Sequence, residues 1–272
     1  IEGLDNLNRT LAPVDQPLRF PVQDVYKFDE RRIIAGRIES GRLKVGDELI
    51  FSPSNRKGTI KTIEEWNADS PPIGARAGQS IGITLEEQIY VERGDVASHE
   101  GDAPILTDVF RATVFWLGDK PLEVGQELKM KLGTGQARVT VQSIDRVIDT
   151  QSLAGGEAAS VERNDVAEVT LRARRLLAVD EYARLPHTGQ FVLIDGYDTV
   201  GGGSISMEGY PDQRQAVSVK SQNLYAVDHL LDPQTRAQRN GHYGAVFWFT
   251  GLSGAGKSTL AMLVERALFD RG

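Results

Sequence analysis

The chain has 272 residues, 40% hydrophobic and 25% charged, which is typical of globular protein, and the length predicts about two domains. It has no cysteine, which excludes disulfides, thiol catalysis and cysteine-bound metals, and no apolar run approaches the roughly 20 residues of a membrane span. The net charge of the chain is −7, and residues 1–210 hold 33 acidic against 24 basic residues, which argues against a nucleic-acid ligand there because phosphate backbones bind basic surfaces.

The first residues of the sequence do not have the pattern of a signal peptide. The chain begins at Ile1 without a methionine, and its first residues have neither the basic start nor the apolar core of a signal peptide. We therefore expect both ends to be cuts through a larger protein, with no membrane partner and a cytoplasmic location.

From Pro17 to about Ile205 the sequence alternates apolar and polar residues in short pieces, a pattern typical of strands with one buried face. Three such pieces are residues 81–85, 128–132 and 167–171. Turn-forming residues punctuate the pattern at 52–58, 133–135 and 155–156. This spacing predicts a mainly β protein built from antiparallel barrels.

One short sequence occurs twice in this β-rich part. Leu-Lys-Val-Gly-Asp-Glu-Leu at 43–49 is echoed by Leu-Glu-Val-Gly-Gln-Glu-Leu at 122–128. The echo favours two tandem barrels, which we place at 17–104 and 105–206, over one larger barrel. Convergent turn chemistry would produce the same echo, so both explanations stay open at this stage.

The pattern changes after the second predicted barrel. Residues 207–222 are polar with few large apolar side chains, which indicates a linker. Residues 223–272 are predicted to form the truncated start of an α/β domain. There, part of 223–241 is expected to be helical, and the apolar run 245–250 is expected to be a buried strand followed by a helix.

A phosphate-binding loop is predicted between that strand and that helix. Its residues are Gly251, Leu252, Ser253, Gly254, Ala255, Gly256, Lys257, Ser258 and Thr259. The bare pattern arises by chance in about one chain in a hundred of this length. The preceding apolar run and the helical spacing of Leu260, Leu263 and Val264 favour a true phosphate loop over a decorative glycine-rich turn.

The chemistry of this loop predicts ATP and Mg²⁺ as its ligands. Glycines let successive backbone amides converge on one anion, and the helix start adds its dipole. The dipole contributes about 0.3–1 kcal/mol whereas micromolar binding needs about 8 kcal/mol, so it cannot suffice alone. We expect Lys257 to contact the β- and γ-phosphates and the Ser258 hydroxyl to hold Mg²⁺. No residue is assigned a catalytic role.

Three sets of residues resemble known families. Residues 17–26, 35–41 and 43–47 resemble the second domain of elongation-factor-Tu-like GTPases, in the variety found in the GTP-dependent large subunit of bacterial sulfate adenylyltransferase. Residues 115–117, 164–169 and 189–195 are similar to the third domain of that subunit. Residues 241–244 and 247–259 resemble the opening of adenylylsulfate kinase. The order resembles that of the bifunctional sulfate-activating enzymes.

The resemblance implies a two-step activity. ATP and sulfate would give adenylyl sulfate with GTP hydrolysis as the driving reaction, and the kinase would then phosphorylate the ribose 3′-hydroxyl of that product. Residues 1–16 would be the remnant of a GTPase domain that binds GTP, and the small catalytic subunit of sulfate adenylyltransferase would be the partner. The piece by itself is expected to be inactive.

Two other interpretations remain. The barrels could belong to a non-catalytic module that binds RNA or protein as translation factors do, although the acidic charge argues against RNA. The loop could also belong to a different small-molecule kinase.

Overall fold

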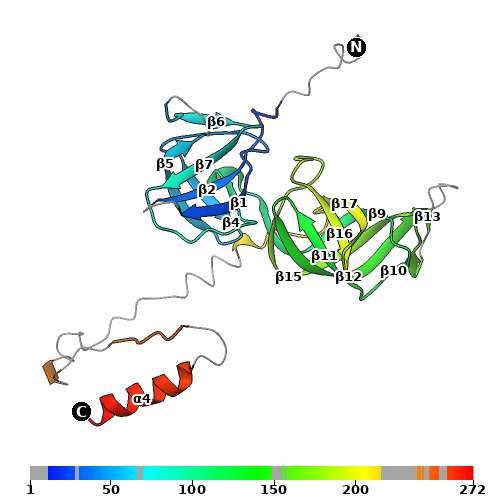
Figure 1. Ribbon diagram of the computed structural model, residues 1–272. Coiled ribbons are helices and arrows are strands. Elements are labelled where there is room, and N and C mark those ends of the chain that lie inside the picture. The colour runs from blue at the N-terminus through cyan, green and yellow to red at the C-terminus, as the bar shows by residue number, and fades with distance from the viewer. Residues whose placement is uncertain are drawn as a thin grey trace. The chain divides into compact units, whose positions relative to one another are not determined.

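The computed structural model describes residues 12–27, 31–65, 70–148, 155–156, 158–215, 238–239, 241, 245–250 and 256–271. The chain divides into two units, residues 1–221 and 222–272, and each is treated by itself. In Figure 1 the strands of the first unit run in colour from blue to yellow, and the helix of the second unit is red. Across these described ranges, no helix combines the length and apolar character that crossing a membrane requires.

A closed antiparallel barrel forms the first half of the β-rich unit (Figure 1). Its strands are β1 (Phe20–Lys27), β2 (Arg32–Arg37), β4 (Glu48–Ser52), β5 (Arg56–Glu64), β7 (Ser80–Leu85) and β8 (Val96–Ser98). They pair in the order β1-β2-β7-β5-β4-β8, and the β1–β8 ladder closes the ring. A two-stranded ribbon, β3 (Arg42–Lys44) with β6 (Gly74–Arg76), accompanies it.

The core of this barrel comes from the inward face of each strand, as the period-two alternation predicts. β7 differs from the expectation of one wet face, because Gly82 and Thr84 are buried as well as Ile81 and Ile83. A Cβ atom at Gly82 would lie 2.5 Å from the side chain of Ile33, and the Thr84 hydroxyl bonds to that of Thr62. Neighbouring strands thus cover the outer face of β7.

A second ring of six strands follows the short 3₁₀ helix η1 (Glu100–Asp102). Its strands are β9 (Ile105–Trp116), β11 (Glu127–Leu132), β12 (Gly135–Ile148), β15 (Val166–Val179), β16 (Gln190–Asp195) and β17 (Asp198–Ser206). They pair in the order β11-β16-β17-β9-β15-β12, and the β11–β12 ladder closes the ring. A small ribbon joins β10 (Leu122–Glu123) to β14 (Ser160–Val161). The predicted fold of two tandem antiparallel barrels is therefore confirmed.

The interior of the second barrel contains large aromatic side chains opposite glycines. Trp116 and Phe191 are buried, and the inward positions of β17 that face them are Gly201 and Gly203. A Cβ atom at Gly203 would lie 2.7 Å from the ring of Phe191, so that ring occupies the volume that a larger residue would need. The expected alternation is confirmed at 128–132, where Leu128 and Met130 are buried and the lysines are exposed. At 167–171 the apolar residues are buried as expected, but Thr170 on the other face is buried as well.

The predicted turn at 155–156 is wrong. Gly155–Gly156 form the short strand β13, which pairs with Val147 and Ile148 at the end of β12. Consecutive glycines are typical of turns, but here the backbone N–H and C=O groups of these glycines pair with the edge of β12 instead.

The echoed sequence adopts the same tight turn in both barrels. Gly46 and Gly125 have φ angles of 87° and 89°, a left-handed region that glycine enters without strain. Each donates its amide to the neighbouring strand. The same turn recurs at Arg76–Gln79, Glu92–Asp95 and Glu162–Asp165, which lack the echoed sequence. Turn chemistry therefore accounts for the echo, and the evidence for two barrels is the strand pairing.

Candidate functional site

The predicted phosphate-binding loop is described from Gly256 onward, and residues 251–255 lie outside the described residues. Gly256 precedes the helix α4 (Lys257–Phe269) in a left-handed conformation, with φ 76° and ψ 13°. Its carbonyl accepts the first helical hydrogen bond, from the Leu260 amide at 2.9 Å. The helix therefore begins at Lys257, as the sequence predicts, in a conformation that favours glycine at position 256.

The first turn of α4 has the properties that an anion site requires. The first amides of a helix have no acceptor within the helix, and Gly256, which precedes α4, has no side chain that could cap them. The first turn contains no acidic residue that would repel phosphate, and the side chains of Ser258 and Thr259 are exposed. These features are compatible with a Mg²⁺-bound polyphosphate, for which the hydroxyl of Ser258 would be a hard oxygen ligand.

The strand predicted before the loop is not formed. Residues 245–250 have no regular structure, and Val246 and Trp248 are 90% and 84% exposed. None of the described residues of α4 is buried, and Leu263 is 63% exposed. A parallel strand needs neighbouring strands and covering helices, so an apolar run without such partners does not become one. The prediction of a buried strand at 245–250 is therefore wrong on both counts, since the run is neither a strand nor buried.

A second cluster of functional interest lies where the two barrels meet. Arg19, next to β1, is 1% exposed and forms a two-bond ion pair with Asp180, at 2.8 and 2.7 Å, just after β15. Its guanidinium also donates to the carbonyls of Leu18 and Asp102. Asp180 accepts a further bond from Thr188 at 2.7 Å. A buried charge in this chain is therefore matched with a counter-ion and with additional acceptors, as burial of charge requires.

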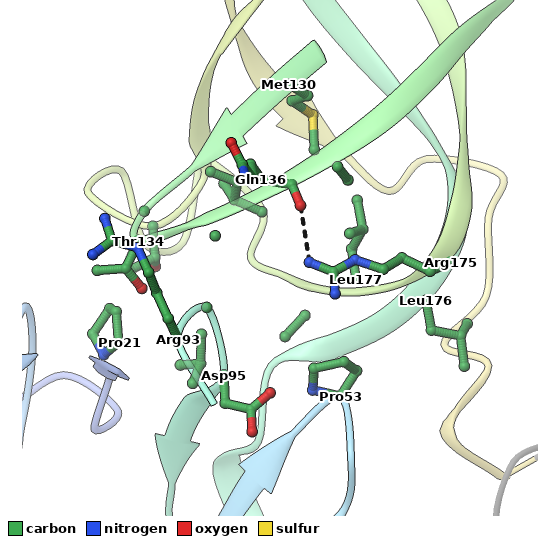
Figure 2. A pocket seen from close by; sticks show the side chains of 18 of the residues that line it. Pro21, Pro53, Arg93, Asp95, Met130, Thr134, Gln136, Arg175, Leu176 and Leu177 are labelled. Atoms are coloured by element: carbon green, nitrogen blue, oxygen red, sulfur yellow. Dashed lines mark hydrogen bonds between the residues drawn. The ribbon is translucent and has the colours of Figure 1, made fainter. Parts of the chain in front are cut away.

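A small cavity of about 50 Å³ lies beside this ion pair, between the barrels. Figure 2 shows its lining, with Pro21, Pro53, Arg93 and Asp95 from the first barrel and Met130, Thr134, Gln136, Arg175, Leu176 and Leu177 from the second. Arg175 donates to the carbonyl of Gln136 at 2.9 Å. One water molecule needs roughly 10–15 Å³ of cavity volume. This cavity therefore has room for a few waters and is too small for a nucleotide.

Asp95 is the titratable group whose environment in this cavity is least favourable to its charge. It is 5% exposed, and its carboxylate accepts one long bond, from the Glu92 amide at 3.3 Å. Burial raises the pKa of Asp95 to about 6, the nearby Glu92 charge acts in the same direction, and Arg175 and Arg56 lower it. The carboxylate therefore changes charge close to neutral pH at the seam between the barrels.

Asp95→Asn is expected to stabilise the protein at neutral pH. The folded pKa lies above the ordinary value of 3.8, so the folded state binds the proton more tightly and stability falls as pH rises from about 4 to about 6. The amide removes this penalty, which predicts a gain of up to about 3 kcal/mol at pH 7.5 and no gain near pH 4. Urea denaturation across this pH range measures it.

The recurring turn provides the control for this prediction. Gln79 and Gln126 occupy the position of Asp95 in two other copies of the turn, so an amide is compatible with its geometry. Asp47→Asn makes the same change at a more exposed copy. A gain for Asp95→Asn that is the same at pH 4 and pH 7.5 would contradict a role for the carboxylate charge.

Arg19, Asp95 and Asp180 were not predicted as functional residues from the sequence. Arg19 lies between the apolar Leu18 and Phe20, both of which are buried. A charged residue inside such an apolar run is the one sequence signal that could have indicated a buried ion pair, and it does not identify the partner.

Comparison with known proteins gives three domain matches in one order. Residues 31–98 match elongation factor Tu domain 2, residues 109–206 match the GTP-eEF1A C-terminal domain-like family, and residues 243–272 match adenylylsulphate kinase. The bifunctional enzyme NodQ of Rhizobium sp. (strain N33) is 33% identical over 275 residues, which cover 100% of this chain and 41% of that protein. The resemblance to the bifunctional sulfate-activating enzymes is confirmed.

Two further similarities concern the barrels. Sulfate adenylyltransferase subunit 1 of Shewanella oneidensis is 36% identical over 185 residues, 66% of this chain and 38% of that protein. A crystal structure of sup35 superposes with a TM-score of 0.66 at 20% identity, covering 75% of this chain and 50% of that one, which shows a shared fold alone. The chain spans about 40% of the length of the curated relatives it matches.

Proposed function

We propose that this chain is part of an enzyme that activates sulfate in two steps. In the first step ATP and sulfate give adenylyl sulfate, coupled to GTP hydrolysis, and in the second step ATP phosphorylates adenylyl sulfate to 3′-phosphoadenylyl sulfate. The proposal rests on the order of the domain matches along the chain. Two elongation-factor barrels are followed by an adenylylsulphate kinase segment.

The second step is assigned to the loop at residues 251–259. Backbone amides of the loop and of the first turn of α4 would hold the phosphates of ATP, and Lys257 would neutralise charge on the β- and γ-phosphates. The 3′-hydroxyl of adenylyl sulfate would attack the γ-phosphorus, lose its proton and release ADP. Mg²⁺, held by the Ser258 hydroxyl and the phosphates, would supply additional neutralisation of charge.

The barrels are assigned a coupling and docking role. The small catalytic subunit of sulfate adenylyltransferase is the proposed partner, and GTP is the proposed ligand of a GTPase domain to which residues 1–16 belong. The proposed domains are 17–104, 105–206 and 223–272, with a linker at 207–222. The two separate core clusters, one within residues 18–97 and one within residues 110–207, support this division. A cytoplasmic location stays a prediction.

The test is an assay of the complete gene product with adenylyl sulfate and ATP labelled at the γ-phosphate. Transfer of the label to a nucleotide product that also contains sulfur supports the proposal. No transfer, together with salt-sensitive submicromolar binding of tRNA on filters, would instead favour the RNA-binding alternative. Transfer of the label to another small hydroxyl compound would favour a different kinase.

A further inference from the structure

The residues that follow the second barrel remain in contact with the β-rich unit. After β17 the chain turns at Met207, which is buried, and Tyr210 packs against the core of the second barrel. The Tyr210 hydroxyl lies 3.3 Å from that of Thr170. This stretch is the start of the region 207–222 that the polar composition predicts to be a linker, and here it packs against the second barrel.

Asp212 and Gln213 fasten this stretch to the first strand of the second barrel. A carboxylate oxygen of Asp212 accepts the Leu106 amide at 3.0 Å, and the Gln213 amide donates to the Leu106 carbonyl at 2.7 Å. The Gln213 side chain donates to Asp108 at 2.7 Å. Both backbone groups of Leu106 are thus satisfied by these two residues, as a paired strand would satisfy them.

Arg214 extends the attachment to the first barrel. Its guanidinium donates to the Ser52 hydroxyl at 3.1 Å and to the side-chain oxygen of Asn55, both in the β4–β5 hairpin. It also donates to the carbonyl of Pro104, in the connection between the barrels, at 2.6 Å. Ser52 is fully buried. One side chain therefore joins the first barrel, the connection and the segment that is fastened to the second barrel.

The hydrogen bonds of Arg214 depend on the two barrels being packed against each other. Burial lowers the pKa of this guanidinium, while the charge of Asp212 acts in the opposite direction. A cation that gives up part of its hydration is stable only while its acceptors stay in place. Two of these acceptors belong to the first barrel and the third to the connection, whereas the neighbouring Asp212 and Gln213 hold the same segment to the second barrel. An opening between the barrels would therefore separate the cation from its acceptors in the first barrel.

We propose that residues 210–215 are an inter-barrel strap, closed by Arg214, that holds the angle between the two barrels. The strap and the ion pair of Arg19 with Asp180 are separate contacts between the barrels. The proposal does not depend on the nucleotide chemistry proposed above. Release of the strap would loosen the two barrels relative to each other.

The experiment is amide hydrogen exchange on the full chain, comparing wild type with Arg214→Ala. The Leu106 amide reports directly on the strap because its acceptor is Asp212. Its exchange is expected to become about tenfold faster or more, as charge-assisted bonds that hold a local segment are lost. The Leu171 amide, in the β9–β15 ladder, is the internal reference for barrel stability.

Two further variants complete this experiment. Arg146→Ala removes an exposed arginine of β12 and is expected to leave the Leu106 exchange unchanged. Gln213→Ala removes the bond to Asp108 while Arg214 remains, and it is expected to have a smaller effect than Arg214→Ala. If Arg214→Ala leaves Leu106 unchanged, or accelerates Leu106 and Leu171 equally, the strap is refuted as a local device.

The angle between the barrels is measured separately. The chain has no cysteine, so Lys61→Cys in the first barrel and Gln142→Cys in the second provide a clean pair for spin labels. Arg214→Ala is expected to broaden the distance distribution of this pair relative to Arg146→Ala. Identical distributions in the two backgrounds would overturn the claim that the strap holds the angle.

Discussion

Asp180→Ala is expected to lower the free energy of unfolding of the two-barrel unit by about 3–5 kcal/mol, because it leaves a buried cation without its counter-ion. Arg19 is 1% exposed and donates two of its hydrogen bonds to the carboxylate of Asp180. For a unit of this size the loss corresponds to a fall in melting temperature of roughly 10 °C. Chemical denaturation followed by circular dichroism measures it.

An exposed ion pair provides the matched control. Asp119→Ala removes the partner of Arg163, whose side chain is 60% exposed, and is expected to change stability by less than about 1 kcal/mol. Arg19→Met combined with Asp180→Ala removes the unpaired cation and is expected to recover part of the loss. A double variant as unstable as Asp180→Ala would show that the cost comes from packing and not from the buried charge.

Lys257→Ala is expected to reduce the proposed adenylylsulfate kinase activity of the complete gene product by about 10²–10³-fold or more, since it removes the charge that the proposal assigns to the transferred phosphoryl group. Adenylyl sulfate synthesis should remain largely intact, because the proposal assigns this loop to the second reaction alone. The two reactions are assayed in parallel, one by release of pyrophosphate and one by transfer of the γ-phosphate.

Arg266→Ala is the control for the helix itself. Arg266 lies on α4, is largely exposed and forms an ion pair with Asp270 one turn later. Its loss is expected to leave both activities near the wild-type level. If Lys257→Ala diminished both reactions equally, the assignment of the loop to the second step would be wrong.

The sequence predicts the strands well because successive side chains of a strand point alternately to the buried and to the exposed face of the sheet. Leu128 and Met130, which alternate with lysines, are buried in the second barrel as that rule requires. The rule fails at β7, where Ile33 and Thr62 from neighbouring strands cover the outer face. Coverage of that kind depends on residues that are distant in the sequence.

In the candidate sites, too, the sequence predicts features that depend on neighbouring residues and fails for features that depend on distant ones. The start of α4 at Lys257 follows from a local signal, a glycine that enters the left-handed region before a helical apolar pattern. The roles of residues 251–259 in nucleotide binding stay a prediction. The strand expected at 245–250 depends on partner strands, and the described residues there adopt no regular structure.

The amino-acid sequence alone determined the β-rich character, the turns that need positive φ angles and the helix after the glycine-rich loop, because all three depend on interactions within a few residues. Only the tertiary structure decided that Arg19 pairs with Asp180 across 161 positions, that Asp95 faces a buried seam and that Arg214 joins both barrels. The physical reason is that burial of a charge is set by surfaces that meet only when the two rings have closed and packed together.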